Sequence, residues 1–280
     1  MDKHITGKQL AAFERHLRLE EREPATIEKY LRDIRGFATW LGGNPLDKEA
    51  AVGWKEHLLA SGYAPSTINS MLIAVNRFFQ FQHWDDLRVK TVRIQRRIFR
   101  SREKELTKEE YVRLLDTAHG LGRERLALLM ETICATGIRV SEVRYITVEA
   151  ARAGRAEIAL KGKIRTILLP GKLRRKLLKY AKKQNTGSGE IFLTRTGKGL
   201  SRRQIWAEMK AICKQAGVSP SKVFPHNLRH LFARTFYRVC RDVVQLSDVL
   251  GHSSVETTRI YLASTGDEYV RRMNRLGLIS

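Results

Sequence analysis

Cysteine is scarce in this sequence of 280 residues, with only Cys134, Cys213 and Cys240, which lie far apart. That spacing excludes a disulfide framework and a cysteine-rich zinc site. Long apolar runs are also missing, since none approaches the roughly 18 residues of a transmembrane helix. The opening MDKHITGKQL lacks the apolar stretch of a signal peptide. We therefore expect a reduced, cytoplasmic protein without a membrane segment.

Acidic residues are in short supply relative to basic ones. The chain holds 52 Lys and Arg against 29 Asp and Glu, a formal net charge of +23. A protein this basic usually binds a polyanion. Hydrophobic residues make up 42% of the chain, far more than in a disordered basic tail. Composition thus indicates a folded protein that binds nucleic acid.

The charge is unevenly distributed along the chain. Residues 1–87 hold 11 basic and 12 acidic residues, residues 88–105 hold 8 and 2, and residues 106–280 hold 33 and 15. A chain of this length accommodates two ordinary domains. We therefore interpret 1–87 and 106–280 as domains and 88–105 as a basic linker between them.

The first region predicts a bundle of four helices. Its apolar residues recur at helical spacing in KQLAAFERHLRLE, PATIEKYLRDIRGFATWLGG, LDKEAAVGWKEHLLASG and APSTINSMLIAVNRFFQFQ. Pro24 suits a first helical turn, Gly42 and Gly43 suit a helix end, and Ser66 is the expected N-cap of the fourth helix. The aromatic residues expected in the core are Phe13, Tyr30, Phe37, Trp40, Phe78 and Phe79.

The linker RVKTVRIQRRIFRSREKE has no helical period. A charge run of this kind is usually a solvated segment. The alternative, which we favour because the run joins two parts of a basic protein, is a segment that follows a phosphate backbone. Its candidate DNA-binding residues are Arg93, Arg96, Arg97 and Arg100.

The second region predicts a helix-rich domain with a small antiparallel sheet, so the expected fold class is mainly α. Thr107 and Glu110 form a capping box, and a helix over 122–136 ends at Gly137. Three short strands are expected at YITVEA, AEIALKG and RTILLP, of which the last two form a hairpin. EIFLTR is a candidate extended segment. Further helices are expected at 171–183, 201–216, 226–238, 242–250, 254–262 and 267–276.

The stretches PHNLRH and GHSSVETTRIY bring together His226, Arg229, His252 and Tyr261. Cleaving DNA without metal requires a nucleophile, donors for the phosphate oxygens and an acid for the leaving oxygen. Arginine suits the phosphate, tyrosine can attack and hold the cut end, and lysine can donate the proton. No His, Asp or Glu grouping has metal-ligand spacing and no P-loop is present, so we expect no metal and no cofactor.

Together with ATGIRVSEV at 135–143 and KGKIRTILLP at 161–170, these stretches resemble the motifs of the tyrosine recombinases, the phage-integrase superfamily. Four blocks in the family's order and approximate spacing make the resemblance specific. It covers about residues 105–265 strongly. The N-terminal region resembles, more loosely, the family's helical SAM-like core-binding domain.

The resemblance implies a catalytic set of Arg139, Lys161, His226, Arg229, His252 and Tyr261. In the family the two arginines grip the scissile phosphate and the lysine is the general acid. The first histidine accepts or relays the nucleophile's proton, and the second bonds the phosphate. The tyrosine forms a 3′-phosphotyrosine and releases a 5′-hydroxyl. Glu142 falls where the family often has a supporting acidic residue.

The hairpin is one residue shorter than the commoner family pattern, so Lys161 and Lys163 compete for the role of the acid. We prefer Lys161 because it precedes the glycine, as the family's lysine does. Further candidate DNA-binding residues in this region are Lys163, Arg165, Arg202 and Arg203.

The resemblance implies a site-specific DNA recombinase that binds double-stranded recombination sites as a homotetramer on two duplexes, exchanging strands through a Holliday junction. Integration or excision of a mobile element and resolution of DNA multimers both fit. One alternative is a DNA-binding protein without catalysis that uses 251–262 as a recognition helix. A type IB topoisomerase is another, although the Xer-like two-domain size and the tail after Tyr261 favour a recombinase.

Overall fold

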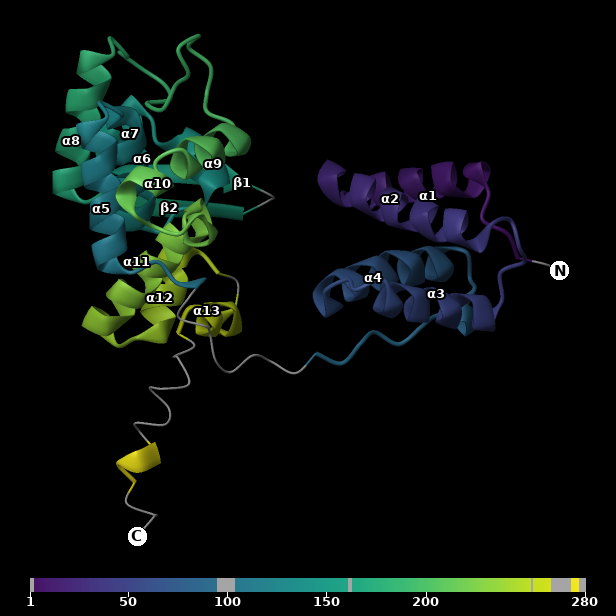
Figure 1. The fold of residues 1–280 in the computed structure, drawn as a ribbon. Helices are drawn as coiled ribbons and strands as arrows, with labels where there is room; N and C mark the ends of the chain where they lie inside the picture. Colours follow the sequence, from purple (N-terminus) through teal and green to yellow (C-terminus); the bar gives the residue numbers. More distant parts are fainter. Residues whose placement is uncertain (1–2, 95–103, 161–162, 253, 263–272, 277–280) are drawn as a thin grey trace. The chain divides into compact units, whose positions relative to one another are not determined.

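The computed structural model describes residues 3–94, 104–160, 163–252, 254–262 and 273–276. The chain divides into two compact units, Met1–Arg96 and Arg97–Ser280, and both are built mainly of helices (Figure 1). The predicted fold class is confirmed. Within the described ranges, no helix combines the length and the apolar character needed to cross a bilayer. The domain boundaries expected near residues 87 and 106 stay predictions.

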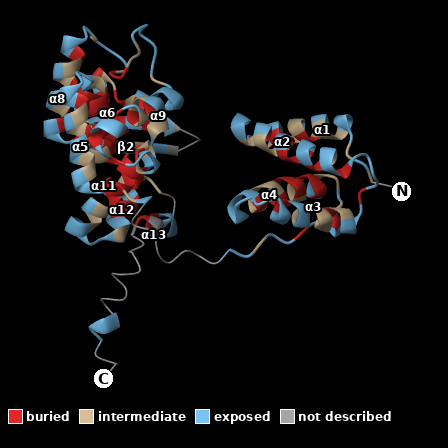
Figure 2. Cartoon of the chain, in the orientation of Figure 1, coloured by how far each residue is buried: buried red, intermediate tan, exposed pale blue. Residues whose placement is uncertain are grey.

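The N-terminal unit consists of four helices and a short 3-10 turn. They are α1 (Gly7–Leu19), α2 (Pro24–Leu41), α3 (Lys48–Ala60), α4 (Pro65–Phe81) and η1 (Asp85–Leu87). Each α-helix turns one apolar face inward, and these faces form a single core for the unit (Figure 2). Burial of these faces stabilises the unit.

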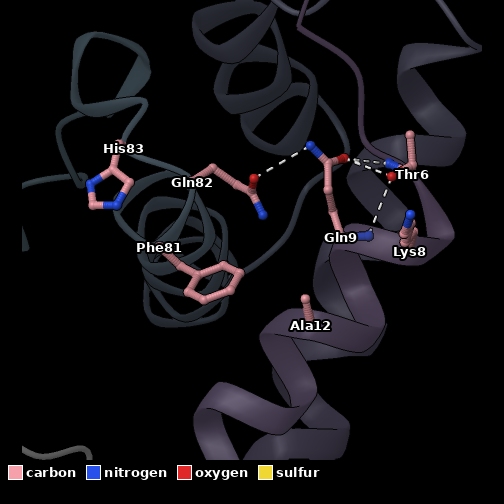
Figure 3. A pocket seen from close by; sticks show the side chains of 7 residues that line it. All are labelled: Thr6, Lys8, Gln9, Ala12, Phe81, Gln82 and His83. Carbon is pink, nitrogen blue, oxygen red and sulfur yellow. Dashed lines mark hydrogen bonds between the residues drawn. The ribbon is translucent and has the colours of Figure 1, made fainter.

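The ends of these helices follow local sequence signals in most cases. Pro24 occupies the first turn of α2, and Gly42 ends α2 in the left-handed conformation at φ 63°, as predicted. Thr6 and Gln9 form a capping box at the start of α1, and Gln9 also contacts Gln82 (Figure 3). The prediction for Ser66 is wrong, because Pro65 is the first residue of α4 and the cap is Ala64, two residues earlier than predicted.

Most of the aromatic residues predicted for the core are buried. Those with no exposed surface are Phe13, Phe37, Phe78 and Phe79. Tyr30 is half-buried. Trp40 is 37% exposed, so its placement in the core was wrong. It lies at the edge of the bundle, where its ring contacts those of Trp54 and His57 at centroid distances of 5.5 and 5.7 Å.

Two asparagines of α4 hold the start of the basic linker against the N-terminal unit. The Asn76 side chain accepts from Val89 N–H and donates to Val89 C=O, both at 2.8 Å. Asn69 makes the same pair of bonds with Val92, at 2.7 and 2.9 Å. The chain at 89–92 therefore lies extended along α4. Of the DNA-binding candidates on the linker, Arg93 is exposed, and the rest lie outside the described residues: Arg96, Arg97 and Arg100.

The C-terminal unit, called the catalytic unit below, has a large apolar core and a smaller apolar cluster. Its first half contains α5 (Lys108–Gly120), α6 (Glu124–Thr136), η3 (Val140–Tyr145), α7 (Val148–Ala153), β1 (Arg155–Leu160), β2 (Lys163–Leu168) and α8 (Gly171–Lys183). Its second half contains α9 (Arg202–Lys210), α10 (Cys213–Ala216), η4 (Pro220–Lys222), α11 (Pro225–Cys240), α12 (Val243–Leu250) and α13 (Val255–Leu262). The two strands pair antiparallel, from Arg155 opposite Leu168 to Leu160 opposite Lys163.

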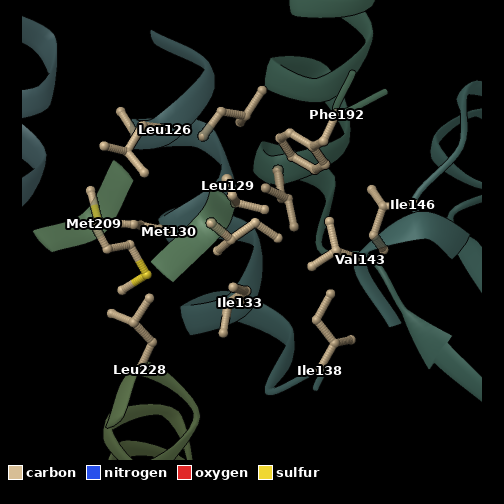
Figure 4. Close-up of a cluster of buried hydrophobic side chains, with 14 of the residues drawn as sticks. Leu126, Leu129, Met130, Ile133, Ile138, Val143, Ile146, Phe192, Met209 and Leu228 are labelled. Atoms are coloured by element: carbon tan, nitrogen blue, oxygen red, sulfur yellow. The ribbon is translucent and has the colours of Figure 1, made fainter. Parts of the chain in front are cut away.

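Helix α6 lies at the centre of this core. Its side chains are buried on nearly every face, as expected for a helix enclosed by others. The cluster around it includes Leu126, Leu129, Met130, Ile133, Ile138, Val143, Ile146, Phe192, Met209 and Leu228 (Figure 4). Both ends of α6 are thereby fixed, and its C-terminal end carries the candidate site.

Two predictions of secondary structure in this unit are corrected. YITVEA is not a strand: Tyr145 ends η3, and the Thr147 side chain caps α7 by accepting from Ala150 N–H. Thr147 makes only an isolated bridge with Glu190, so the sheet of the described residues has two strands. The helix expected at 201–216 is interrupted between α9 and α10. Most of the helix expected at 267–276 falls outside the described residues.

Candidate active site

A tight turn after α6 positions Arg139. Gly137 ends α6 in the left-handed conformation at φ 65°, as the sequence predicts. A Cβ at this position would lie 2.4 Å from Cδ1 of Phe232 and 2.9 Å from a methyl carbon of Leu250. Only glycine therefore lets α6 end so close to α11 and α12. Two residues later, Arg139 is the N-cap residue of η3.

Glu142 orients the Arg139 side chain. Its carboxylate accepts from Arg139 N–H at 2.7 Å and from Arg139 Nη1 at 3.0 Å. Glu142 is 2% exposed, and Arg165 Nη2 donates to the same carboxylate at 2.5 Å. The side chain of Arg139 is 42% exposed, so it stays accessible to a ligand while Glu142 holds Nη1 of its guanidinium. This arrangement offers a fixed fork of donors to an anion.

Arg229 is the second arginine of the site, and it is 2% exposed. Nη1 donates to Gly137 C=O, Nη2 donates to Leu250 C=O at 2.9 Å, and Nε lies 3.4 Å from the Tyr261 hydroxyl. The two carbonyls belong to the C-terminal ends of α6 and α12, where helix dipoles place negative partial charge. They compensate a buried cation whose pKa burial lowers from its usual value.

His252 follows α12 and lies between Arg229 and α13. Its Nε2 is 2.9 Å from Arg229 Nη2, and its Nδ1 is 2.8 Å from the buried Thr258 hydroxyl. A guanidinium can only donate, so Nε2 accepts and Nδ1 carries the proton toward Thr258. Burial, reinforced by Arg229, Arg139 and Arg165, lowers the pKa of His252 to about 4. The imidazole is therefore neutral at physiological pH.

Tyr261 lies on α13 and is 4% exposed. Its ring contacts His230, His252 and His226 at centroid distances of 4.2, 5.5 and 5.8 Å. Nε2 of His226 is 3.1 Å from Nε2 of His230, one turn along α11. A small apolar cluster from α11 and α12 packs against the tyrosine. The tyrosine ring is thus surrounded by three imidazoles, and its hydroxyl lies beside Arg229.

The structure brings five of the six predicted catalytic residues into one cluster: Arg139, His226, Arg229, His252 and Tyr261. Lys161 lies outside the described residues, and Lys163 is described only as the first residue of β2. Arg202 and Arg203 are exposed at the start of α9.

Arg165 had been predicted to contact DNA, but its guanidinium is turned toward Glu142 and Leu250. Sequence reasoning missed this inward position, as well as Thr258 and the carbonyls of Gly137 and Leu250. The sequence of β2 did indicate an inward Arg165. Side chains two residues apart on a strand share a face, and Ile167 on that face is buried.

The chemistry available here is that of a nucleophile beside a phosphate site. Two guanidiniums supply charged donors, and a tyrosine hydroxyl lies next to one of them. Three imidazole rings, those of His226, His230 and His252, contact the tyrosine ring, and an imidazole nitrogen can accept or donate a proton. Among residues that the structure describes, no three His, Cys, Asp or Glu side chains gather as metal ligands.

Comparison with known families matches both units. Residues 104–268 match the phage integrase family, and residues 10–86 match the phage integrase N-terminal SAM-like domain. The chain is 30% identical over 276 residues to tyrosine recombinase XerA of Thermococcus kodakarensis, covering 95% of this chain and 94% of that protein. It is 30% identical over 268 residues to tyrosine recombinase XerD of Brucella suis, covering 84% and 85%.

Solved structures share the fold at lower identity. A lambda integrase dimer bound to a COC′ core site aligns with a TM-score of 0.74 at 17% identity, covering 91% of this chain and 94% of that one. XerH recombinase bound to its difH substrate aligns with a TM-score of 0.68 at 20% identity, covering 95% and 84%. A lambda integrase tetramer bound to a Holliday junction aligns with a TM-score of 0.74 at 18% identity, covering 93% and 78%.

Proposed function

The chain belongs to the phage integrase family of tyrosine recombinases, and from that membership we propose that Tyr261 is the nucleophile of its reaction. The protein is a site-specific recombinase that breaks and rejoins DNA. In the proposed step, the Tyr261 hydroxyl attacks the scissile phosphorus and the 5′ oxygen leaves. The product is a 3′-phosphotyrosine and a free 5′-hydroxyl.

One observation carries this proposal: the Tyr261 hydroxyl lies 3.4 Å from Arg229 Nε, and Arg229 is bound to the same turn after α6 that leads into Arg139. A nucleophile must lie next to the groups that hold the phosphate it attacks. The two arginines bind the non-bridging oxygens, on which negative charge grows in the transition state. The phosphotyrosine preserves the energy of the cut bond, so rejoining needs no nucleotide.

The remaining residues handle protons and orientation. His226 accepts or relays the proton of Tyr261, beside which its ring lies. Lys161 supplies a proton to the leaving oxygen, with Lys163 as the alternative. His252 accepts a bond from Arg229 in this state and so orients the guanidinium. It donates from Nε2 to a phosphate oxygen only after that nitrogen gains a proton, by ring protonation or a change of tautomer, and gives up its contact with Arg229.

We further propose that the protein acts as a homotetramer on two double-stranded recombination sites and exchanges strands through a Holliday junction. Support comes from the lambda integrase tetramer bound to a Holliday junction and from XerH bound to its difH substrate. The exposed Arg93, Arg202 and Arg203 are candidate phosphate contacts in this assembly, with the linker candidates Arg96, Arg97 and Arg100. The biological role of this recombination is either integration and excision of a mobile element or resolution of DNA multimers.

Sequencing of DNA trapped on the protein tests this function. Nicked genomic fragments are incubated with the chain, and covalent complexes are isolated under denaturing conditions, because a nick near the cut prevents rejoining. We expect one recurring site, with Tyr261→Phe as a control that binds DNA and traps none. If the wild-type protein forms no covalent complex with DNA, the proposal is contradicted. Recovery of the two ends of one element indicates integration, and a single chromosomal site indicates multimer resolution.

A further inference from the structure

Strand β2 places a charged residue inside and two apolar residues outside. Arg165 pairs across the hairpin with Ile158, and both Ile158 and Ile167 on that face are buried, at 1% and 3% exposed. On the opposite face Ile164 and Leu168 are 81% and 74% exposed. The side chain of Arg165 is only 15% exposed. An arginine that serves only as a surface charge would occupy the outer face.

The inward side chain joins three elements of the site. Arg165 Nη2 donates to the buried Glu142 carboxylate at 2.5 Å, and Nη1 donates to Leu250 C=O at the end of α12. Gly251 lies so close that an added Cβ would be 2.4 Å from Arg165 Cδ, and its φ is 62°. The hairpin, η3 and the turn that carries His252 therefore meet at one guanidinium.

Both acceptors of Arg165 are shared with the phosphate-binding arginines. Glu142 also accepts from Arg139, and Leu250 C=O also accepts from Arg229. A shift of Arg165 would thus change the partners of both. Burial of Arg165 destabilises the fold in two ways. It disfavours the charged form and so lowers the pKa of Arg165, and it leaves Nε–H without an acceptor among the described residues. A costly buried cation at this junction indicates a role in the site.

We propose that Arg165 is a positioning residue that fastens the β1–β2 hairpin to the two phosphate-binding arginines and so holds the general acid of the hairpin at the leaving oxygen. Lys161 precedes Arg165 by four residues in the sequence and lies outside the described residues. The inference rests on the proposed function, in which a hairpin lysine protonates the leaving oxygen. It replaces the expectation that Arg165 itself contacts DNA.

The test uses two substrates that differ in their need for an acid. A 5′-bridging phosphorothioate leaves as a thiolate and needs no proton, whereas the ordinary phosphodiester does. Single-turnover cleavage of both is measured for Arg165→Gln, with Arg155→Gln as the matched control. Arg155 lies on β1 with its side chain 64% exposed, so its loss removes the same charge from the same hairpin. Lys161→Ala and Arg139→Ala serve as references for loss of the acid and of a phosphate donor.

We expect Arg165→Gln to slow cleavage of the ordinary substrate by about 10²-fold, the effect of displacing a catalytic group by about 1 Å. The phosphorothioate should restore most of that loss, as it does for Lys161→Ala, and Arg155→Gln should stay within about 3-fold of the wild-type rate. DNA affinity of Arg165→Gln should be nearly unchanged. A salt dependence of binding that falls by about one unit would instead make Arg165 a phosphate contact and overturn the proposal.

Arg165→Lys keeps a charge opposite Glu142 but has one nitrogen in place of the two that bind Glu142 and Leu250, so it provides a second variant if Arg165→Gln does not fold. It should show the same rescue from a smaller loss. Cleavage by either variant that the phosphorothioate does not restore, as with Arg139→Ala, would overturn the positioning of the acid. A wild-type protein that forms no covalent complex on either substrate would instead contradict the nucleophilic role of Tyr261.

Discussion

Replacing Gly137 by alanine is expected to destabilise the catalytic unit and to displace Arg229. An alanine at φ 65° costs about 1–2 kcal/mol in left-handed strain alone. Its Cβ would also lie 2.4 Å from Cδ1 of Phe232, and relieving such overpacking costs about 1–3 kcal/mol more. The total is about 2–5 kcal/mol. Because Gly137 C=O accepts from Arg229, cleavage should fall by at least about 10-fold in protein that remains folded.

Gly122→Ala separates the two contributions. Gly122 has the same φ of 65°, lies in the same unit, and has no atom within 4 Å of an added Cβ. Backbone strain should therefore lower the free energy of unfolding of this variant by only about 1–2 kcal/mol, and its cleavage rate should stay unchanged. Calorimetric unfolding of the full chain compares the two variants through the transition of the catalytic unit. Equal destabilisation by both, or normal cleavage by folded Gly137→Ala, would refute the close packing described at this turn.

Arg139→Ala should lower the cleavage rate by about 10²–10³-fold in single-turnover assays, because it removes a charged donor for the transition state. An equal loss of DNA affinity would mean that this arginine only positions DNA. Asn69→Ala and Asn76→Ala should each lower the stability of the N-terminal unit by about 1–3 kcal/mol, since each leaves two backbone groups without their partners. Unfolding of the unit at the wild-type temperature would contradict the docking of residues 89–92. The pKa of His252 is about 4 in the folded state against 6.5 unfolded, so its stabilising contribution is complete above pH 6.5 and is lost as the pH falls toward 4. The loss is about 2 kcal/mol after allowance for its partial exposure, and His252→Gln should remove it from the pH dependence of unfolding; an unchanged profile would show that the imidazole does not titrate there.

Local signals predicted the helix ends where one residue decides the outcome. The Thr107 and Glu110 capping box and the left-handed Gly137 and Gly42 appear as expected. Ser66 failed because the preceding Pro65 already suits a first helical turn and moves the cap back to Ala64. Both residues favour a helix start, and the sequence does not show whether the cap is Ser66 or the residue before Pro65.

Packing overrode local preference at YITVEA. Its β-branched residues favour a strand, but Thr147 caps a helix, and Ile146 and Val148 are buried in the core on either side of it. Without knowledge of the neighbouring α8, against which α7 packs, the alternation alone indicated a strand. Tertiary contacts decided the outcome.

The candidate site could be predicted residue by residue only where the family motifs reach. Arg139, Arg229 and Tyr261 come together as the resemblance implies. The acceptors that hold the arginines are main-chain carbonyls of Gly137 and Leu250, which have no side-chain signature in the sequence. For the same reason, charge alone assigned Arg165 to DNA, although its partners lie within the protein.

Identification of the peptide that carries DNA provides the decisive measurement for the nucleophile. Wild-type protein trapped on a nicked substrate is digested with trypsin and nuclease, and the nucleotide-linked peptide is sequenced by mass spectrometry. Since the Tyr261 hydroxyl lies beside Arg229, we predict the modification on Tyr261 and no linked peptide from Tyr261→Phe. A nucleotide found on Tyr269, or on any other residue, would contradict the assignment of Tyr261 as the nucleophile.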